Sequence, residues 1–258
     1  MATMLTEHSV AEAARTAGLT APARYVEVTG STNTDLLQAA RGGAPAWTVL
    51  VAGRQTEGRG RLGRTWTSPA GSSLHVSVLL RPDLPGRQAP LLSLAAAVAM
   101  AEACETAHVD VRCKWPNDLR CRDRKLGGVL SEASVQGGRL GHVVVGTGVN
   151  LTQTTEDFPP ELRGSAISVA MAGGDPDGSS LLTTYLSRLK DWAAAPSGPE
   201  LLTVFRSRCE TLGRTVRAAT PYGDVEGVAV DITDAGELVV TNANGTYLVG
   251  YGEIVHIT

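Results

Sequence analysis

Apolar residues along the chain follow two periods, one typical of helices and one typical of strands. Helical spacing or Ala-rich apolar runs predict helices over 6–17, 31–43, 90–107, 180–195 and 198–211. Apolar, β-branched runs predict strands over 47–52, 73–81 and 109–115, and a hairpin of two longer strands, 125–135 and 139–151. This mixture predicts an α+β domain in which a mixed β-sheet is flanked by helices.

The helix over 31–43 has recognisable signals at both ends. Thr32 and Asp35 have the spacing of a capping box, with Asp in place of the usual Glu, which predicts an N-cap at Thr32. Gly42 and Gly43 predict its end.

The pattern changes after Leu212 and Gly213, where short alternating stretches replace the long elements. The turn sequences PYGD, DAGE and NANG separate four or five predicted strands. Some 46 residues of this kind are typical of a small β-barrel. We therefore expect a larger domain over 1–211 and a small β-barrel domain over 212–258.

Composition narrows the classes of function. The net charge is −3, whereas a protein that grips nucleic acid broadly is normally basic. The four cysteines form no C-x-x-C pair, as expected of reduced thiols in the cytoplasm. The longest apolar run, 91–107, is interrupted by Glu102 and Glu105 and predicts a buried helix. No signal peptide and no membrane span are expected.

The stretch EGRGRLGRTW, residues 57–66, contains the spacing G-x-G-x-x-G of a dinucleotide-binding loop. In that fold a helix must open inside the loop, but here Pro69, Gly71 and then a strand follow, so we reject this interpretation. Glycines allow close approach of the backbone, and arginines bind phosphate or carboxylate. The loop therefore suits a mobile flap over an anion, although a solvated basic loop has the same composition.

Three further stretches carry polar residues at predicted strand ends. In KWPND (114–118) an amide and a carboxylate meet at one turn, in RKLGGVLSE (124–132) a lysine precedes two glycines, and GTGVN (146–150) ends a strand. Each also has an ordinary structural interpretation: an Asn/Asp turn, an exposed strand end and a hairpin exit. Trp66 and Trp115 could equally pack in the core. His75 and His142 fall on strands and are expected to be core or surface residues.

Taken in order, these motifs resemble the biotin protein ligases. The resemblance covers residues 28–151 and lies in six stretches: GSTN (30–33), the run from Gln55 to Trp66, SLHVSVLLR (73–81), KWPNDL (114–119), RKLGGVLSE and GTGVN. It implies the class II synthetase-like fold of the biotin and lipoate ligases for a catalytic domain over 1–211, followed by an SH3-like domain over 212–258. RKLGG has Gly where many members have Ala, a small departure with no expected loss of activity.

The resemblance also implies the chemistry. Members use ATP and Mg²⁺ to convert biotin to biotinyl-5′-AMP, and then transfer biotin to one lysine of a carrier domain. The expected partner is the biotin carboxyl carrier domain of an acyl-CoA carboxylase. Biotin and ATP are substrates, and no permanently bound cofactor or fixed metal is expected. Mg²⁺ would come with ATP, with Asp118 as the candidate carboxylate beside it.

The family pattern assigns roles to individual positions. It places on the biotin side Ser31, Thr32, Asn33, Gln55, Arg59, Gly60, Arg61, Lys125, Gly127 and Gly128. It places on the ATP side Arg59, Arg61, Arg64, Trp66, Asn117, Lys125 and Asn150. Catalysis is assigned to Lys125, Arg61 and Asp118, with Lys125 as the first choice for stabilising the transition state.

Other functions are weighed beside this one. A lipoate or octanoate ligase shares the fold but needs a pocket without partners for a ureido ring, and GSTN and the arginine loop favour biotin. A regulator could hold biotinyl-AMP without transferring it. Only 30 residues precede Ser31, too few for a winged helix-turn-helix, so no specific DNA binding is expected. Monomer and homodimer both stay open, with an exposed edge along 139–151 as a possible pairing site.

Overall fold

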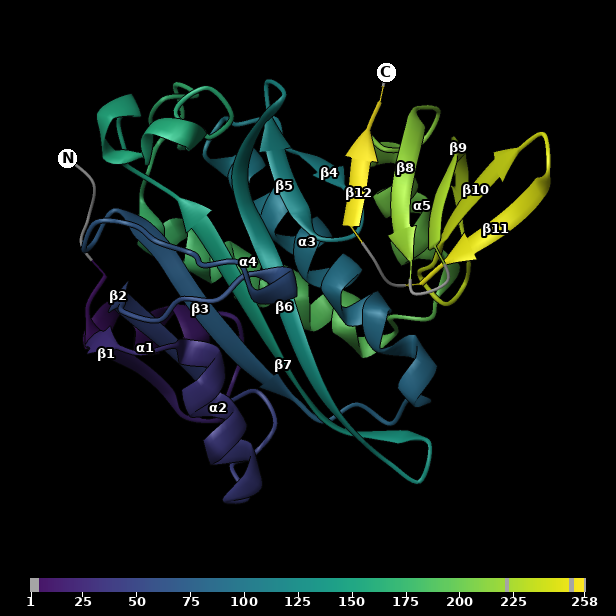
Figure 1. Ribbon diagram of the computed structural model, residues 1–258. Coiled ribbons are helices and arrows are strands. Elements are labelled where there is room, and N and C mark those ends of the chain that lie inside the picture. Colours follow the sequence, from purple (N-terminus) through teal and green to yellow (C-terminus); the bar gives the residue numbers. More distant parts are fainter. Residues whose placement is uncertain (1–4, 221–222, 251–252, 258) are drawn as a thin grey trace.

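The structure is a computed structural model and describes residues 5–220, 223–250 and 253–257. Its centre is a seven-stranded mixed sheet in the order β1-β2-β3-β7-β6-β5-β4, in which β1 and β2 are parallel and the other pairs antiparallel (Figure 1). The strands are β1 (Ala23–Thr29), β2 (Val49–Gln55), β3 (Ser73–Leu80), β4 (Arg112–Lys114), β5 (Asp118–Cys121), β6 (Arg124–Gln136) and β7 (Arg139–Asn150).

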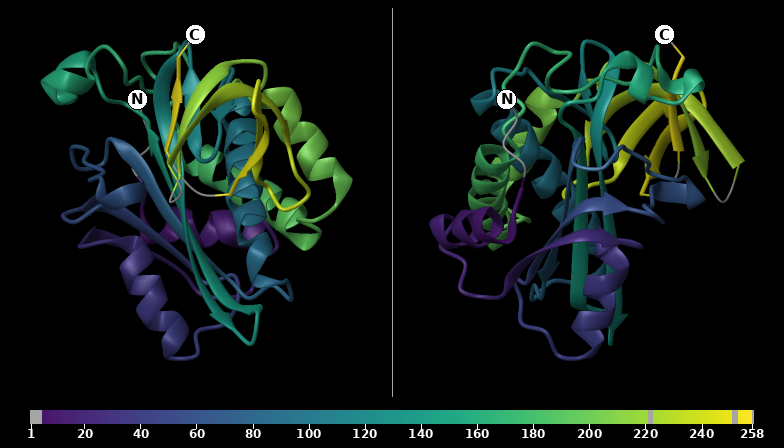
Figure 2. Two further views of the ribbon diagram at one scale, coloured as in Figure 1. Left: turned by 45° about the vertical axis from the view of Figure 1, so that its right-hand side comes forward. Right: turned by 90° about the vertical axis from the view of Figure 1, so that its left-hand side faces the viewer.

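Helices cover the two faces of this sheet unequally (Figure 2). Four of them pack with the main apolar core on one face, and α2 alone packs with a small second cluster on the other. The helices are α1 (Glu7–Thr16), α2 (Thr32–Arg41), α3 (Ala89–Thr106), α4 (Gly178–Ala194) and α5 (Pro199–Arg208), with 3₁₀ turns η1 (Arg61–Gly63), η2 (Gly86–Gln88), η3 (Thr155–Asp157) and η4 (Pro160–Leu162).

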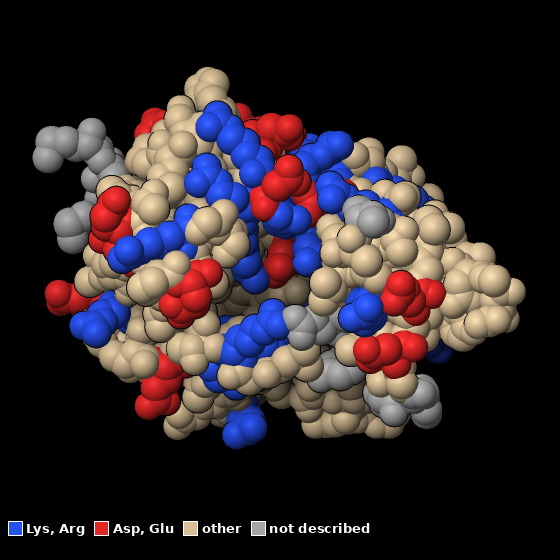
Figure 3. All heavy atoms as spheres, turned by 45° about the horizontal axis from the view of Figure 1, so that its top comes forward, with Lys and Arg blue, Asp and Glu red and all other residues tan. Residues whose placement is uncertain are grey.

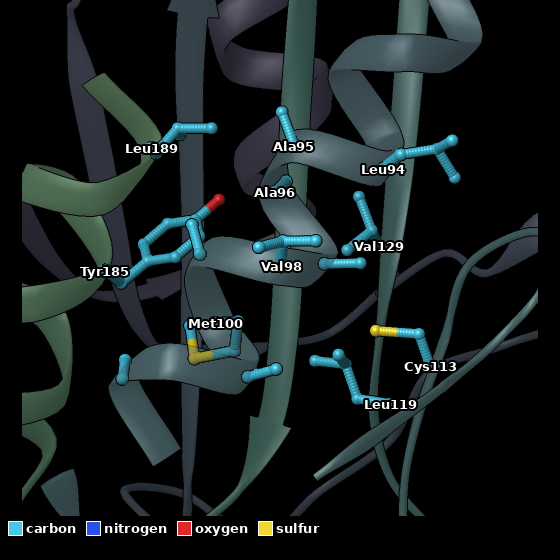
Figure 4. Close-up of a cluster of buried hydrophobic side chains, with 14 of the residues drawn as sticks. Leu94, Ala95, Ala96, Val98, Met100, Cys113, Leu119, Val129, Tyr185 and Leu189 are labelled. Atoms are coloured by element: carbon cyan, nitrogen blue, oxygen red, sulfur yellow. The ribbon is translucent and has the colours of Figure 1, made fainter. Parts of the chain in front are cut away.

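Helix α3 forms the middle of the main core. Its side chains pack between the sheet and α4, as the close-up of Val98, Met100 and Tyr185 shows (Figure 4). The segment Gly86–Thr106 is long and apolar enough to pass a membrane-span test, but two thirds of it is buried inside the protein. Burial on all sides accounts for its apolar composition, because a helix that packs all round needs no polar face.

Side chains along β3 and β7 alternate between the main core and the opposite face of the sheet, which carries α2. On β7, Val143, Val145 and Val149 point into the main core, so Gly146 and Gly148 between them face the side that carries α2. On β3, the same rule directs His75 and Ser77 to that side. The α2 face of the sheet therefore lacks large apolar side chains at this point.

A second, five-stranded antiparallel sheet follows at the C-terminus, in the order β11-β10-β9-β8-β12. Its strands are β8 (Thr215–Thr220), β9 (Gly223–Ile232), β10 (Leu238–Asn242), β11 (Gly245–Val249) and β12 (Glu253–His256). It matches the expected SH3-like domain, except that the described residues form an open sheet rather than a closed barrel. Of the turn PYGD, Pro221 and Tyr222 lie outside the described residues.

Most predicted elements form, but two strands were missed and one helix start was wrong. Strand β1 was not predicted because it lies at the sheet edge, where half-exposed residues blur the apolar pattern. The N-cap of α2 is Ser31 rather than Thr32, because the Thr32 backbone N–H and hydroxyl bind the Gln55 side chain instead. Asp35 accepts a hydrogen bond from Thr29 and takes no part in a capping box.

Smaller differences concern three strands and one loop. The predicted strand 109–115 shortens to β4, and β5 had no signal because it is a four-residue strand with charged side chains. The strand 139–151 is not an edge, because β7 pairs with β3 on one side and with β6 on the other. The predicted loop 171–180 ends early, since α4 begins at Gly178.

Trp115 joins the two sheets. Its side chain is 2% exposed, and its indole Nε1–H donates to the Gly236 carbonyl at 3.0 Å, in the loop before β10.

We expect Trp115→Phe to lower the free energy of unfolding by about 2 kcal/mol, because the buried carbonyl loses its donor and a gap remains. Urea denaturation measures this.

Trp192→Phe is the matched control for this prediction. The Trp192 indole donates to Glu102, but both side chains are partly exposed, so water can replace the lost bond. Equal losses in the two variants would contradict a special role of the Trp115 contact.

Candidate functional site

Two cavities adjoin each other beside the sheet, and the loop 57–66 forms a wall of both. The first, which we call the sheet cavity, has a volume of about 470 Å³ and is lined by the start of α2, by β3, by β7 and by the turn 114–118. The second, the outer cavity, has about 770 Å³ and lies against the start of α3 and the middle of β6. Lys and Arg side chains surround the hollow seen in Figure 3.

The floor of the sheet cavity depends on two glycines of β7. A Cβ at Gly146 would lie 2.1 Å from Asn33 Oδ1, and one at Gly148 would lie 3.0 Å from the Trp66 ring. A methyl group at Gly146 would displace Asn33, because real Cβ atoms do not approach so closely, and one at Gly148 would press on the Trp66 ring. The motif GTGVN therefore lets α2 and the loop 57–66 lie directly on the sheet.

The start of α2 provides the polar end of the sheet cavity. Thr32 donates from its backbone N–H and its hydroxyl to Gln55 Oε1, at 2.9 and 3.1 Å. The Ser77 hydroxyl lies 2.7 Å from both Thr32 Oγ1 and Asn33 Oδ1. These bonds fix the direction of Thr32 and Gln55, which both line the cavity beside Ser31.

The loop 57–66 is a short hairpin. Gly60 N–H donates to Arg64 C=O at 2.7 Å, and Trp66 N–H donates to Gly58 C=O at 2.9 Å. At its tip Leu62 and Gly63 have positive φ values of 56° and 74°. The Leu62 side chain is 51% exposed, so the tip packs against little. We call the segment 57–66 the flap.

Cations and an acid meet where the sheet cavity reaches the turn 114–118. Lys125 Nζ donates to Asp118 Oδ1 at 2.5 Å, and both side chains are partly exposed. Arg61 donates from the flap to Asn117 Oδ1 at 3.3 Å. Burial lowers the pKa of Lys114, the nearby charge of Asp118 opposing that shift. This end of the cavity suits an anion.

His75 lies on the cavity floor but does not carry charge at neutral pH. The side chain is 2% exposed, and burial lowers its pKa to about 4. Its ring nitrogens lie 3.3 Å from the Ala52 carbonyl and 3.0 Å from the Ser68 hydroxyl. Nδ1–H donating to the carbonyl leaves Nε2 as an acceptor for Ser68, which satisfies a neutral ring.

Most of the residues predicted for the site come together here. The sheet cavity is lined by Ser31, Thr32, Asn33, Gln55, Arg59, Gly60, Arg61, Arg64, Trp66, Asn117, Asp118, Lys125 and Gly128. Two do not line either cavity. Gly127 faces the core side of β6, where a Cβ would come 2.5 Å from Gly148 O, and Asn150 is buried against Ile167 and Gln153.

Sequence reasoning missed three residues of this region: Ser77, Lys114 and Glu132. His75 was expected to be a core or surface residue, and it is buried. For Ser77 the signal was available, since it falls on an alternate position of β3 within a quoted motif. Lys114 and Glu132 lie inside quoted motifs as well, but the partners of Glu132, Asn33 and Arg59, are distant in sequence.

The described residues contain no group of three or more His, Cys, Asp and Glu side chains that could hold a metal ion. In that part of the chain Asp118 supplies the carboxylate that lines the sheet cavity. A single carboxylate suits Mg²⁺ that is held mainly by substrate phosphates and water. The four cysteines are buried and unpaired.

Two family models match the chain. The Biotin/lipoate A/B protein ligase family matches residues 25–150, and the Biotin protein ligase C terminal domain matches residues 211–257. The biotin–[acetyl-CoA-carboxylase] ligase of Mycobacterium tuberculosis is 37% identical over 241 residues, which cover 90% of this chain and 88% of that protein. This chain belongs to the biotin protein ligase family.

Other relatives agree with this assignment. The bifunctional ligase/repressor BirA of Bacillus spizizenii is 34% identical over 227 residues, 86% of this chain and 70% of that protein. Among solved structures, the Aquifex aeolicus biotin protein ligase in complex with biotin and ATP has a TM-score of 0.73 at 28% identity, covering 90% of this chain and 96% of that one. The mixed sheet with its C-terminal sheet is thus the fold of these ligases.

His75 predicts a pH dependence of stability for this family member. Its folded pKa of about 4 lies below the ordinary 6.5, so between these values the unfolded chain binds a proton that the folded chain does not. Stability contributed by His75 is therefore present above pH 6.5 and is lost as pH falls toward 4. Between pH 7 and pH 5 the loss is about 2 kcal/mol.

We expect His75→Gln to remove this part of the pH dependence. Urea denaturation of the two proteins at pH 7, 6 and 5 measures it, and all other titrating groups cancel in the comparison. If the free energy of unfolding changed with pH equally in the two proteins, His75 would have the same pKa in the folded and unfolded states, contrary to this prediction.

Proposed function

We propose that the chain converts biotin and ATP to biotinyl-5′-AMP and then transfers biotin to a lysine of the biotin carboxyl carrier domain of an acyl-CoA carboxylase. One observation carries the proposal: a single cavity has a neutral hydrogen-bonding end at Thr32 and Gln55 and a cationic end at Lys125 and Arg61. Biotin has the same polarity, with a ureido ring at one end and a carboxylate at the other. The names of the relatives support the carboxylase as acceptor.

The neutral end fits the ureido ring by its donors and acceptors. Gln55 uses its Oε1 for Thr32, which leaves its amide N–H groups toward the cavity as donors for the ureido oxygen. Ser31 caps α2 without a side-chain hydrogen bond to the helix, so its hydroxyl is available to a ligand. A volume of about 470 Å³ is ordinary for a pocket of this kind.

The cationic end fits the first step of the reaction. The biotin carboxylate attacks the α-phosphorus of ATP, a new oxygen–phosphorus bond forms, and pyrophosphate leaves. Both reactants are anions, so their approach requires neutralisation at the meeting point. Lys125 can exchange its contact with Asp118 for oxygens of the carboxylate and the α-phosphate, and Arg61 can do the same from the flap.

Asp118 is then available to bind another group. Once Lys125 turns to the phosphate, the Asp118 carboxylate can hold Mg²⁺ that arrives with ATP, or the ε-amine of the acceptor lysine. In the second step that amine attacks the acyl carbon, the bond to AMP breaks, and a proton leaves the nitrogen. A carboxylate beside the amine is suited to position it and to accept that proton.

The remaining predicted residues take supporting parts in this proposal. Trp66 provides a flat face over Gly148 for the adenine ring, and Arg59, Arg64 and Asn117 lie on the ATP side of the same cavity. The flap excludes water from the mixed anhydride, which would otherwise hydrolyse. We place Gly127 and Asn150 in the framework, where they hold β6 and β7 in position.

ATP–pyrophosphate exchange tests the proposal. Purified protein with Mg²⁺ is offered biotin, lipoate or octanoate in parallel, and we expect exchange with biotin alone, since Thr32 and Gln55 have no partner in an aliphatic chain. Exchange with lipoate or octanoate would assign the protein to the related ligases. Exchange with none of the three, together with tight biotinyl-AMP binding, would indicate a regulator.

Lys125→Ala tests the assigned catalytic residue. We expect adenylate formation to fall by at least about a hundredfold, because the charge that bridges the two anions is lost. The fold should persist, since Lys125 and its partner Asp118 are both partly exposed. Circular dichroism checks the fold, and pyrophosphate exchange checks the rate.

Lys190→Ala is the matched control. Lys190 caps the end of α1 through the carbonyls of Ala17 and Gly18, far from both cavities, and should retain normal exchange. Near-normal activity of Lys125→Ala would remove Lys125 from its role.

A further inference from the structure

Glu132 joins the flap to the sheet, although the proposed chemistry gives it no task. Its Oε2 accepts from Arg59 Nη2 at 2.7 Å and from Asn33 Nδ2 at 2.9 Å. Arg59 belongs to the flap, and Asn33 lies in the first turn of α2. One carboxylate oxygen therefore connects a loop with little other packing at its tip to the most buried part of the site.

The connection continues into the polar end of the sheet cavity. Asn33 is 4% exposed, and its Oδ1 lies 2.7 Å from the Ser77 hydroxyl, which lies 2.7 Å from Thr32 Oγ1. Thr32 in turn binds Gln55. Polar contacts at hydrogen-bond distance thus run without a gap from Gln55, where a ligand would bind, to Arg59 in the flap.

The geometry leaves Asn33 no freedom to leave this series. Its Nδ2 donates both to Glu132 and to the Leu130 carbonyl, so both of its amide atoms are engaged. Gly146 makes room for it, since a Cβ there would lie 2.1 Å from Asn33 Oδ1. A ligand that immobilises Thr32 and Gln55 therefore also holds Asn33. Through Asn33 it holds Glu132, which accepts the hydrogen bond from Arg59 of the flap.

We propose that Glu132 is a positioning residue that holds the flap closed through Arg59 and couples flap closure to occupation of the polar end of the sheet cavity. The identity of the occupant, biotin, rests on the proposed function, but the contact between Glu132 and the flap does not. Glu132 touches no reacting atom in this account and acts only through Arg59 and Asn33.

The strength of the contact suits a flap that must open in each cycle. The Arg59 and Glu132 side chains are 42% and 27% exposed, so salt screens their attraction. Half-exposed pairs of this kind favour the closed form by about two- to fivefold. A buried pair would hold the flap shut and prevent release of product.

Tryptic cleavage of the flap measures the closed population without any ligand. Trypsin cuts after Arg59, Arg61 and Arg64 only when the flap opens, and mass spectrometry identifies these cuts. We expect Glu132→Gln, which keeps the shape but removes the charge, to speed flap cleavage by about threefold at 50 mM salt. At 500 mM salt the two proteins should converge, because the pair is then screened.

Biotin binding measures the coupling. Since coupling is reciprocal, the same variant should weaken biotin binding by about the same threefold factor, and biotin should protect its flap less than it protects the unaltered flap. Titration calorimetry gives the first quantity, and cleavage with and without biotin gives the second.

Two controls separate this role from a general loss of structure. Asp83→Asn removes another exposed ion pair, with Arg139, far from the flap, and should leave flap cleavage and biotin binding unchanged. Gly146→Ala should open the flap as Glu132→Gln does, by displacing Asn33. Gly141→Ala on the same strand should not, because its Cβ would find its nearest neighbour at 3.6 Å.

Equal flap cleavage in the unaltered protein and in Glu132→Gln, at low and at high salt, would overturn the proposal. So would weaker biotin binding with no change in flap cleavage, since Glu132 would then act on the cavity alone. A protein that binds no biotin, but in which Glu132→Gln opens the flap, would refute the proposed function and leave the contact with the flap standing.

Discussion

The site depends on how closely other elements can approach one strand, β7. Gly146 accommodates the Asn33 amide, and Gly148 accommodates the Trp66 ring, so that α2 and the flap rest on bare backbone. On the opposite face of the same strand, Val145 and Val149 are fully buried in the core. The twofold period of a strand lets β7 act as core on one side and as cavity floor on the other.

Within this framework, three basic side chains near the anion end each have a protein partner that a substrate can replace. Lys125 contacts Asp118, Arg59 contacts Glu132, and Arg61 contacts Asn117. Both ion pairs are partly exposed and therefore individually weak. A carboxylate or phosphate that enters the cavity competes with these partners at little cost, and the displaced groups stay close enough to return when the product leaves.

Periodicity and turn residues predicted the helices and five of the seven strands of the large sheet, because those signals are local, but missed β1 and β5. The contacts of Asn33 with Leu130 and Glu132 could not be predicted, since they join residues 97 and 99 positions apart. Belonging to a motif also did not show which side of the sheet a residue faces. Gly127 and Gly128 are neighbours, yet only Gly128 faces the cavity. Their pairing separates them, because Gly127 lies opposite Val149, which points into the core, and Gly128 lies opposite Gly148 on the cavity floor.

The C-terminal sheet takes part in this site through Trp115. Trp115 lines both cavities, its indole N–H donates to the Gly236 carbonyl, and its backbone N–H donates to the Thr211 hydroxyl oxygen at 3.0 Å. Ile254 of β12 also lines the sheet cavity. A shift of the small sheet would therefore move a cavity wall. The change of sequence pattern near residue 211 marks where one sheet gives way to another, but the shape of the cavity depends on both.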